Sequence, residues 1–293
     1  MSLMRALIES IEQHGRTVKV YPVATLVLLA IAAQILYTGW IKHTLTHSVG
    51  YLLAVWCGLL LTDVVVKIAP APAVGFPIKH PVMQESLIII GSIVLGMVLL
   101  IVRFSPVWTT IHGLGRVSLF VLLLLFVFPI ALALVFLFIY RYKLRQLGIN
   151  LQYWYLPIFI NLLFGGITLA VAPELSHWKI FFRGTRFFGA LYTGIITAGL
   201  AEEFTRMLLQ TRLGHAFHNK GIGFVVATSL WASMHMPLDW SQHPHKSFMQ
   251  IVIGALQIIP IGLFWGYLTH RTKSLLPAVL THGLNLWGIQ NSL

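Results

Sequence analysis

Two adjacent glutamates, Glu202 and Glu203, lie inside the apolar stretch GLAEEFTRMLL at residues 199–209. An ionised carboxylate that faces lipid costs about 2.5–3.5 kcal/mol on insertion scales, so each of them needs a partner or water. Arg206 follows the two glutamates by four and three residues and is therefore a helical neighbour of both. One arginine can neutralise one glutamate and leave the second available as a base. Two interpretations fit this pattern equally: a structural clamp near the membrane interface, or an active site.

Histidines on two other apolar segments favour the active site. His235 ends the stretch WASMH, before Met236 and Pro237, and His282 lies in the stretch THGLN. We expect both at middle depths of the membrane that overlap the depth of Glu202. A single intramembrane histidine is usually a packing residue, whereas titratable groups from three helices at one depth indicate a functional site. The remaining histidines lie in or near loops, and the sequence lacks HExxH, GxSxG and P-loop signatures.

The composition is that of a polytopic membrane protein. Hydrophobic residues make up 57% and charged residues 10% of the sequence, against about 25% charged residues in soluble domains. Apolar runs of roughly 20 residues, each long enough to cross a bilayer, recur along the chain. The net charge of +12 is spread over short loops, which favours contact with anionic lipid headgroups and argues against nucleic acid. The prediction is an all-α bundle of about eight to nine transmembrane spans.

The hydrophobic runs predict three regions along the chain. Residues 1–20 are an amphipathic or flexible N-terminal segment, residues 21–150 an N-terminal transmembrane scaffold of about four spans, and residues 151–293 the catalytic transmembrane domain. Asp63 in the scaffold is expected to pair locally with Lys67, four residues later. In the catalytic region, Ala190, Gly194 and Ala198 form a ridge of small residues suited to close helix packing. The nine candidate spans are 21–41, 48–67, 86–102, 118–140, 153–172, 187–209, 221–238, 248–268 and 274–292.

The basic residues predict the orientation of these spans. Thirteen of the 20 lysines and arginines fall on one side if the N-terminus is cytoplasmic, and the segment RYKLR at 141–145 is the strongest anchor. The compact loops and the absence of a cleavable signal peptide are typical of a multi-pass protein of the bacterial inner membrane. We therefore expect a cell-membrane protein with a cytoplasmic N-terminus.

The polar motifs resemble those of a known protease family. EEFTR at 202–206 is similar to the EExxxR motif of the CPBP intramembrane proteases, which process CAAX proteins and bacteriocins, although Arg206 follows Glu203 by three residues instead of four. WASMH at 231–235 resembles the family's FxxxH motif, with Trp231 in place of the usual phenylalanine. THGLN at 281–285 resembles its HxxxN motif, but Asn285 follows His282 by three residues instead of four. The resemblance covers residues 187–290 and keeps the order of the motifs.

This resemblance implies a glutamic endopeptidase that hydrolyses a peptide bond of a membrane-associated protein or peptide. By position, Glu202 and His235 would activate a water molecule, and His282 and Asn285 would donate hydrogen bonds to the oxyanion. Positions three and four beyond His282 share roughly one helix face, so Asn285 could still point into the site. Glu203 and Arg206 would support Glu202. No metal or other cofactor is implied, and the partners are the substrate and membrane lipids.

Three alternatives remain open on the sequence alone. Glu202, His235 and His282 are also suitable ligands for a catalytic zinc ion, with Glu203 as the base. A proton-coupled transporter would equally place Glu, His and Arg in the membrane, although the sequence shows no repeat that relates its two halves. The third alternative is a non-catalytic immunity or scaffold protein with a decayed site, which the shifted asparagine would allow.

Overall fold

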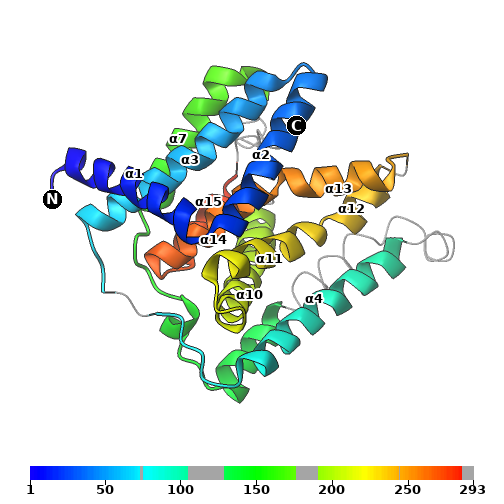
Figure 1. The fold of residues 1–293 in the computed structure, drawn as a ribbon. Helices are drawn as coiled ribbons and strands as arrows, with labels where there is room; N and C mark the ends of the chain where they lie inside the picture. Colours follow the sequence, from blue (N-terminus) through cyan, green and yellow to red (C-terminus); the bar gives the residue numbers. More distant parts are fainter. Residues whose placement is uncertain (73–74, 105–128, 176–190, 244, 286–293) are drawn as a thin grey trace.

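The structure is a computed structural model that describes residues 1–72, 75–104, 129–175, 191–243 and 245–285. Every regular element within these ranges is a helix, so the predicted all-α class is confirmed. Figure 1 shows α10, α11, α14 and α15 at the centre, α1, α2, α3 and α7 on one side of them, and α4 on another.

Four helices build most of the N-terminal half. They are α1 (Leu3–Val20), α2 (Pro22–Ile41), α3 (Leu45–Ile68) and α4 (Val82–Phe104). The last three coincide with predicted spans and are long and apolar enough to cross a membrane. The predicted span 118–140 lies partly outside the described residues. Its described part is an apolar helix, Pro129–Ile139, which ends in the π-helical turn η2 (Val135–Ile139).

The C-terminal half is built from shorter and interrupted helices. After the 3₁₀ turn η3 (Leu144–Leu147), α7 (Leu156–Val171) and the 3₁₀ turn η4 (Pro173–Leu175) follow. The π-helix η5 (Tyr192–Glu202) continues directly into α10 (Glu203–Ala216). The remaining elements are α11 (Lys220–Ser233), α12 (Met236–Gln242), α13 (Phe248–Gln257), α14 (Ile259–Thr272) and α15 (Leu276–Gly283).

Prolines explain where two predicted spans are interrupted. The predicted helix 221–238 stops at Ser233, and α12 begins anew with Pro237 in its first turn. The predicted helix 248–268 changes from α13 to α14 at Ile258, again with a proline, Pro260, in the first turn of the new helix. Proline lacks the N–H that an interior helical position needs, and its ring clashes with the preceding turn, so it favours a helix start. Residues 248–272 nevertheless remain one apolar stretch of 25 residues.

The last predicted span is shorter than expected within the described residues. It covers 274–292, whereas α15 ends at Gly283 and residues 286–293 lie outside the description. In the described part of the chain, four helices have the length and hydropathy of a full span, and two shorter apolar helices accompany them. The predicted eight to nine spans include these shorter helices and segments that lie partly outside the described residues.

Two hydrophobic clusters meet at the central helices. One joins α3, α7 and α14 through residues such as Tyr51, Phe164 and Phe264. The other joins α4, the segment around Tyr140 and α10, and includes Met207. The helices α11 and α15 contribute residues to both clusters. The central helices are therefore fixed on two sides by buried apolar contacts, which is what a precisely positioned polar site requires.

Asp63 has a different partner from the one expected. The prediction of a local pair with Lys67 is wrong: Asp63 is fully buried and pairs with Arg271 of α14. Its carboxylate also accepts the Tyr267 hydroxyl at 2.7 and 2.8 Å, and lies 3.0 Å from Nε2 of His14 on α1. A buried carboxylate needs several hydrogen-bond partners. Tertiary contacts from two other helices supply them here, so Asp63 fastens α1 and α14 to α3.

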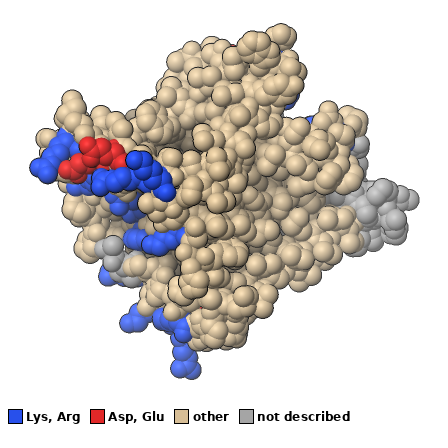
Figure 2. All heavy atoms as spheres, viewed as in Figure 1, with Lys and Arg blue, Asp and Glu red and all other residues tan. Residues whose placement is uncertain are grey.

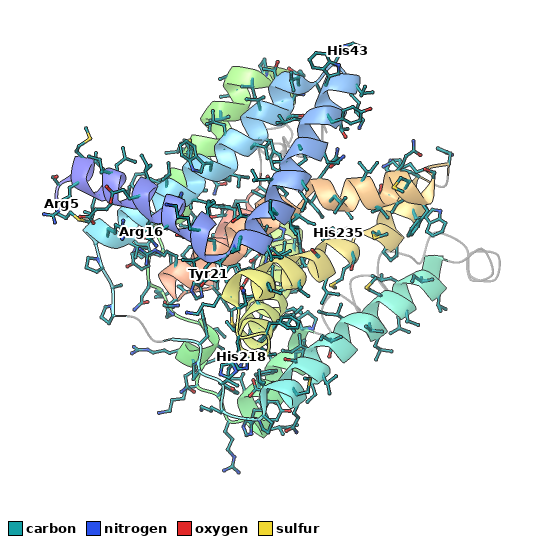
Figure 3. The ribbon with its side chains drawn as sticks, viewed as in Figure 1. Arg5, Arg16, Tyr21, His43, His218 and His235 are labelled. Atoms are coloured by element: carbon teal, nitrogen blue, oxygen red, sulfur yellow. The ribbon has the colours of Figure 1, made fainter. Side chains whose placement is uncertain are left out.

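Charged side chains are confined to a small part of the visible surface. Figure 2 shows lysines and arginines on the side of the molecule that carries α1 and at its lower tip, whereas most of the remaining visible surface is uncharged. Arg5 and Arg16 lie along α1 (Figure 3) and are exposed. The same helix exposes Leu3, Met4 and Ile8 by 68%, 66% and 50%. This combination of apolar and basic exposure is typical of a helix that lies in a membrane interface.

Candidate active site

The two glutamates lie at a change of helix type. Glu202 is the last residue of the π-helix η5, and Glu203 is the first residue of α10. Long π-helical stretches are rare and often occur at functional sites, because the wider turn alters the direction of the side chains. The two neighbouring carboxylates consequently enter different surroundings.

Glycines allow η5 and α15 to touch through their backbones. A β-carbon at Gly199 would lie 2.5 Å from the carbonyl oxygen of Val279, and one at Gly283 would lie 2.6 Å from Cα of Ile195. Gly194 of the predicted small-residue ridge meets the backbone of Gly283 as well, while Ala190 lies outside the described residues. This close approach carries His282, the neighbour of Gly283, to the glutamate pair.

Glu203 is buried between two partners. Its side chain is 1% exposed and forms an ion pair with the equally buried Arg206. Its second oxygen lies 2.8 Å from Nδ1 of His282. The guanidinium of Arg206 lies over the rings of Trp231 and Trp265, with its Cζ 4.9 and 5.6 Å from their centroids. Arg206 thus takes the glutamate three residues before it, and Glu202 remains outside that pair.

Glu202 faces both histidines. Its Oε2 lies 3.8 Å from Nε2 of His235 and 4.0 Å from Nε2 of His282. These distances are too long for direct hydrogen bonds and match a spacing that a bridging water can fill. The indole N–H of Trp231 donates to the same oxygen at 2.5 Å. The Glu202 side chain is 16% exposed, so it is not fully enclosed by the protein.

The hydrogen-bond partners of His235 and His282 indicate which ring nitrogen carries the hydrogen. Nδ1 of His235 lies 3.2 Å from the backbone oxygen of Trp231, which can only accept, so Nδ1 carries the hydrogen and the Nε2 of the neutral ring has a free lone pair. Nδ1 of His282 likewise donates to Glu203. Trp265 stacks on the His282 ring at 3.7 Å with an interplanar angle of 13°. Each ring is held at one nitrogen and directs the other nitrogen towards Glu202.

The structure brings Glu202, His235 and His282 together, as the motif spacing predicted, and places Asn285 at the end of a helix. Because α15 stops at Gly283, Asn285 does not continue its face; its backbone N–H donates to the carbonyl of His282 at 3.1 Å. The role of Asn285 as an oxyanion donor stays a prediction.

A pocket adjoins the glutamate on the side of α4. Its volume of about 60 Å³ exceeds the roughly 10–15 Å³ that one water requires. Glu202, Thr205 and Arg206 contribute polar groups, and the rest of the wall is mostly apolar. The walls come from α4, the helix 129–139, the η5–α10 helix and α11, and the remaining lining residues are Ser92, Ile93, Gly96, Leu100, Pro129, Leu132, Ala201, Leu209, Ala227, Trp231 and Met234.

Sequence reasoning missed the α4 wall and the roles of the two tryptophans. α4 consists of ordinary apolar residues around Ile93 and Gly96, and no spacing there indicates a site. Trp265 is likewise one aromatic residue in an apolar run. Within the described ranges, no group of three His, Cys, Asp or Glu side chains has an arrangement that could hold a metal ion.

Comparison with known protein families finds a match to one family model. Residues 183–287 match the model of a family described as type II CAAX prenyl endopeptidase Rce1-like. This match confirms the predicted resemblance to the CPBP proteases, and it spans all the residues discussed above from Glu202 to Asn285. No curated protein and no solved structure matches the chain.

Proposed function

We propose, from the match of residues 183–287 to the family of type II CAAX prenyl endopeptidases described as Rce1-like, that the protein is a CAAX-type membrane protease and a glutamic endopeptidase. It would hydrolyse a peptide bond of a membrane-associated protein or peptide, with Glu202 and His235 activating the water. The observation that carries this proposal is the convergence of Oε2 of Glu202 with Nε2 of His235 and Nε2 of His282 at 3.8 and 4.0 Å.

The proposed first step is a proton transfer from the bound water. A water held between Glu202 and His235 gives one proton to the Glu202 carboxylate, and its oxygen attacks the peptide carbonyl carbon. The carbonyl π-bond becomes the oxyanion of a tetrahedral intermediate. When the C–N bond breaks, the proton passes to the leaving amine. General acid–base catalysis of this kind contributes about 10²–10⁴-fold to a rate.

The proposal assigns stabilisation of the oxyanion to His282 in its imidazolium form. Because Nδ1 donates to Glu203, Nε2 can donate only when the ring is an imidazolium. The carboxylate of Glu203 holds Nδ1 of this ring, and Arg206 forms an ion pair with the second oxygen of Glu203. A fixed donor at an oxyanion contributes about 10²–10³-fold. Asn285 would supply a second donor, as the family resemblance implies.

The pocket supports a substrate that enters from the apolar side. Its mostly apolar walls run from α4 to Glu202, so a lipid-anchored or hydrophobic segment can approach the carboxylate without crossing water. A prenylated peptide with a CAAX terminus is the substrate class that the family description names, and it is the first one to test.

The test is cleavage of a farnesylated CAAX peptide by the purified protein in proteoliposomes. We expect wild-type protein to release the terminal tripeptide, and Glu202→Ala, His235→Ala and His282→Ala each to lose at least about 10²-fold in kcat/KM. The exposed Glu174→Ala, in η4, serves as the control and should retain activity. Cleavage that survives both Glu202→Ala and His235→Ala at normal protein levels would end the proposal.

A chelator separates this mechanism from a zinc-dependent one. We expect 1,10-phenanthroline to leave the cleavage rate unchanged, because the proposed mechanism uses only protein side chains and a water molecule. Inhibition that added zinc reverses would favour the metal mechanism with the same side chains. Proton-coupled uptake into proteoliposomes that persists in Glu202→Ala would favour a carrier.

A further inference from the structure

We propose that Trp231 is a positioning residue of this site, and that its indole N–H holds the Glu202 carboxylate in place for the two histidines. The inference rests on the proposed function for its catalytic consequence, but its contact can be tested without any activity. It concerns a position at which this chain departs from the motifs of the family that it resembles, since Trp231 stands in place of the usual phenylalanine.

The contact is short and the ring that makes it is fixed. Nε1 of Trp231 lies 2.5 Å from Oε2 of Glu202. The residue is 5% exposed, and a β-carbon on Gly262 would come within 2.6 Å of its ring, so α14 packs directly beneath it. Trp265 meets the same ring edge-on at a centroid distance of 6.0 Å. Packing therefore sets the direction of the N–H before any substrate binds.

Glu202 depends on this donor because the nearby cation is engaged elsewhere. Arg206 forms its ion pair with Glu203, and both histidine nitrogens lie beyond hydrogen-bond distance of Glu202. A carboxylate without a fixed donor would rotate about its side-chain torsions. The indole holds one oxygen so that the water position between Glu202 and His235 is preserved, which is the orientation that general-base catalysis needs.

Trp231 also holds His235, but through a different group. Its backbone oxygen accepts from Nδ1 of His235 at 3.2 Å. Any residue at position 231 offers this carbonyl, so phenylalanine would retain it. Only the contact to Glu202 requires an indole, because phenylalanine has no hydrogen-bond donor. Trp231→Phe thus removes one contact of the site and leaves the other.

Trp265 provides a matched comparison. It is buried as well, and among the described residues its indole nitrogen has no hydrogen-bond partner. We expect Trp231→Phe to lower kcat for the farnesylated peptide by about 10- to 100-fold with little change in KM, the range for a lost hydrogen bond to a charged group. Trp265→Phe should lose less, because it removes ring area and no hydrogen bond. Trp240→Phe, at an exposed position, is the control for replacing a tryptophan by phenylalanine outside the site.

The pH profile of kcat/KM distinguishes loss of the hydrogen bond from loss of packing, because loss of packing alone should not shift it. The groups that face Glu202 are His235, His282 and the Glu203–Arg206 pair, and all remain in Trp231→Phe. Loss of a donor to the ionised carboxylate makes protonation easier, so the acidic limb of the kcat/KM profile should move to higher pH in Trp231→Phe and stay in place in Trp265→Phe. If Trp231→Phe fails to fold, benzothienylalanine at position 231, which exchanges the N–H for sulfur in a ring of the same shape, replaces it.

The contact itself is tested by NMR of protein labelled with ¹⁵N-tryptophan. We expect one indole N–H resonance far downfield, missing in Trp231→Phe and moved upfield in Glu202→Gln. Absence of this resonance, or wild-type kcat and an unshifted pH profile in Trp231→Phe, would overturn the inference. If no variant and no wild-type protein cleaves the peptide, the proposed function fails, and the resonance still decides whether Trp231 holds Glu202.

Discussion

At the scale of single residues, Glu202 and Glu203 are neighbours in sequence with different surroundings. Glu203 is buried and paired with Arg206 and His282, whereas Glu202 is part-exposed and its carboxylate accepts the Trp231 N–H. Glu202 also lies near both imidazoles, outside the ion pair. We therefore propose a structural and electrostatic role for Glu203 and the proton transfer for Glu202.

This division predicts different effects of two isosteric substitutions on thermal stability. Glu203→Gln leaves Arg206 as a buried charge without its carboxylate, which costs about 3–5 kcal/mol when one member of a buried pair is removed. Glu202→Gln removes no buried ion pair. In detergent-solubilised protein, thermal unfolding of Glu203→Gln should therefore begin well below that of wild type, and that of Glu202→Gln should be unchanged. Equal unfolding temperatures for the two variants would contradict the assignment.

The sequence predicted the meeting of Glu202, His235 and His282, because the motifs place all three on apolar helices at overlapping depths. It could not distinguish which glutamate takes Arg206, since the arginine is a helical neighbour of both. The hydrogen bond from the Trp231 indole to Glu202 could not be predicted either, because it depends on the relative rotation of η5 and α11. Residue types identify such a site, and helix packing assigns the roles within it.

At the scale of elements, the close packing of η5 against α15 positions the site. Most of the predicted spans correspond to helices, because hydrophobic length alone fixes them. The interruptions at His235 and Ile258 were missed although Pro237 and Pro260 indicate them, since a run of apolar residues conceals a helix break. The π-helical geometry before Glu203 has no sequence signal, because it arises from tertiary contacts of the glycine-rich face.

Alanine in place of Gly199 or Gly283 should push η5 and α15 apart. Gly199→Ala and Gly283→Ala would each press a methyl group onto backbone atoms at 2.5–2.6 Å, and overpacking of this kind costs about 1–3 kcal/mol. We expect both variants to unfold at lower temperature and to lose activity as His282 moves from Glu203.

Two other helical glycines are the controls for this experiment. Gly91 in α4 and Gly166 in α7 have open space where a β-carbon would lie. Alanine there should be neutral or should raise the unfolding temperature, because alanine is the better helix former by about 1 kcal/mol. Activity of Gly283→Ala equal to that of Gly91→Ala would show that the close approach of η5 and α15 is dispensable.

At the scale of the whole molecule, we propose that α1 lies along one membrane surface. It packs against α3 near Asp63, while its apolar residues and its basic residues are exposed side by side (Figure 3). An interfacial helix buries its apolar side in the acyl boundary and keeps its charges at the headgroups. The cytoplasmic placement of this surface is the orientation that the distribution of basic residues predicts.

Spin labels on two sides of α1 measure its depth. In a background with Cys57→Ser, labels at Ile11→Cys and Arg16→Cys in anionic proteoliposomes should report different environments. We expect the label at position 11 to be relaxed by oxygen, which concentrates in lipid, and the label at position 16 by an aqueous nickel complex. Equal exposure of both labels to the nickel complex would show that α1 does not lie in the interface.

The central claim is that Glu202, and not its neighbour, is the base. Its most direct test is the single-turnover cleavage rate of the farnesylated CAAX peptide by Glu202→Gln in proteoliposomes, beside Glu174→Gln as an exposed control. We predict a fall of about 10²–10⁴-fold in the chemical step for Glu202→Gln, the contribution of a general base, with unchanged peptide binding and a fully active control. A cleavage rate within a few fold of wild type for Glu202→Gln would contradict the proposed mechanism.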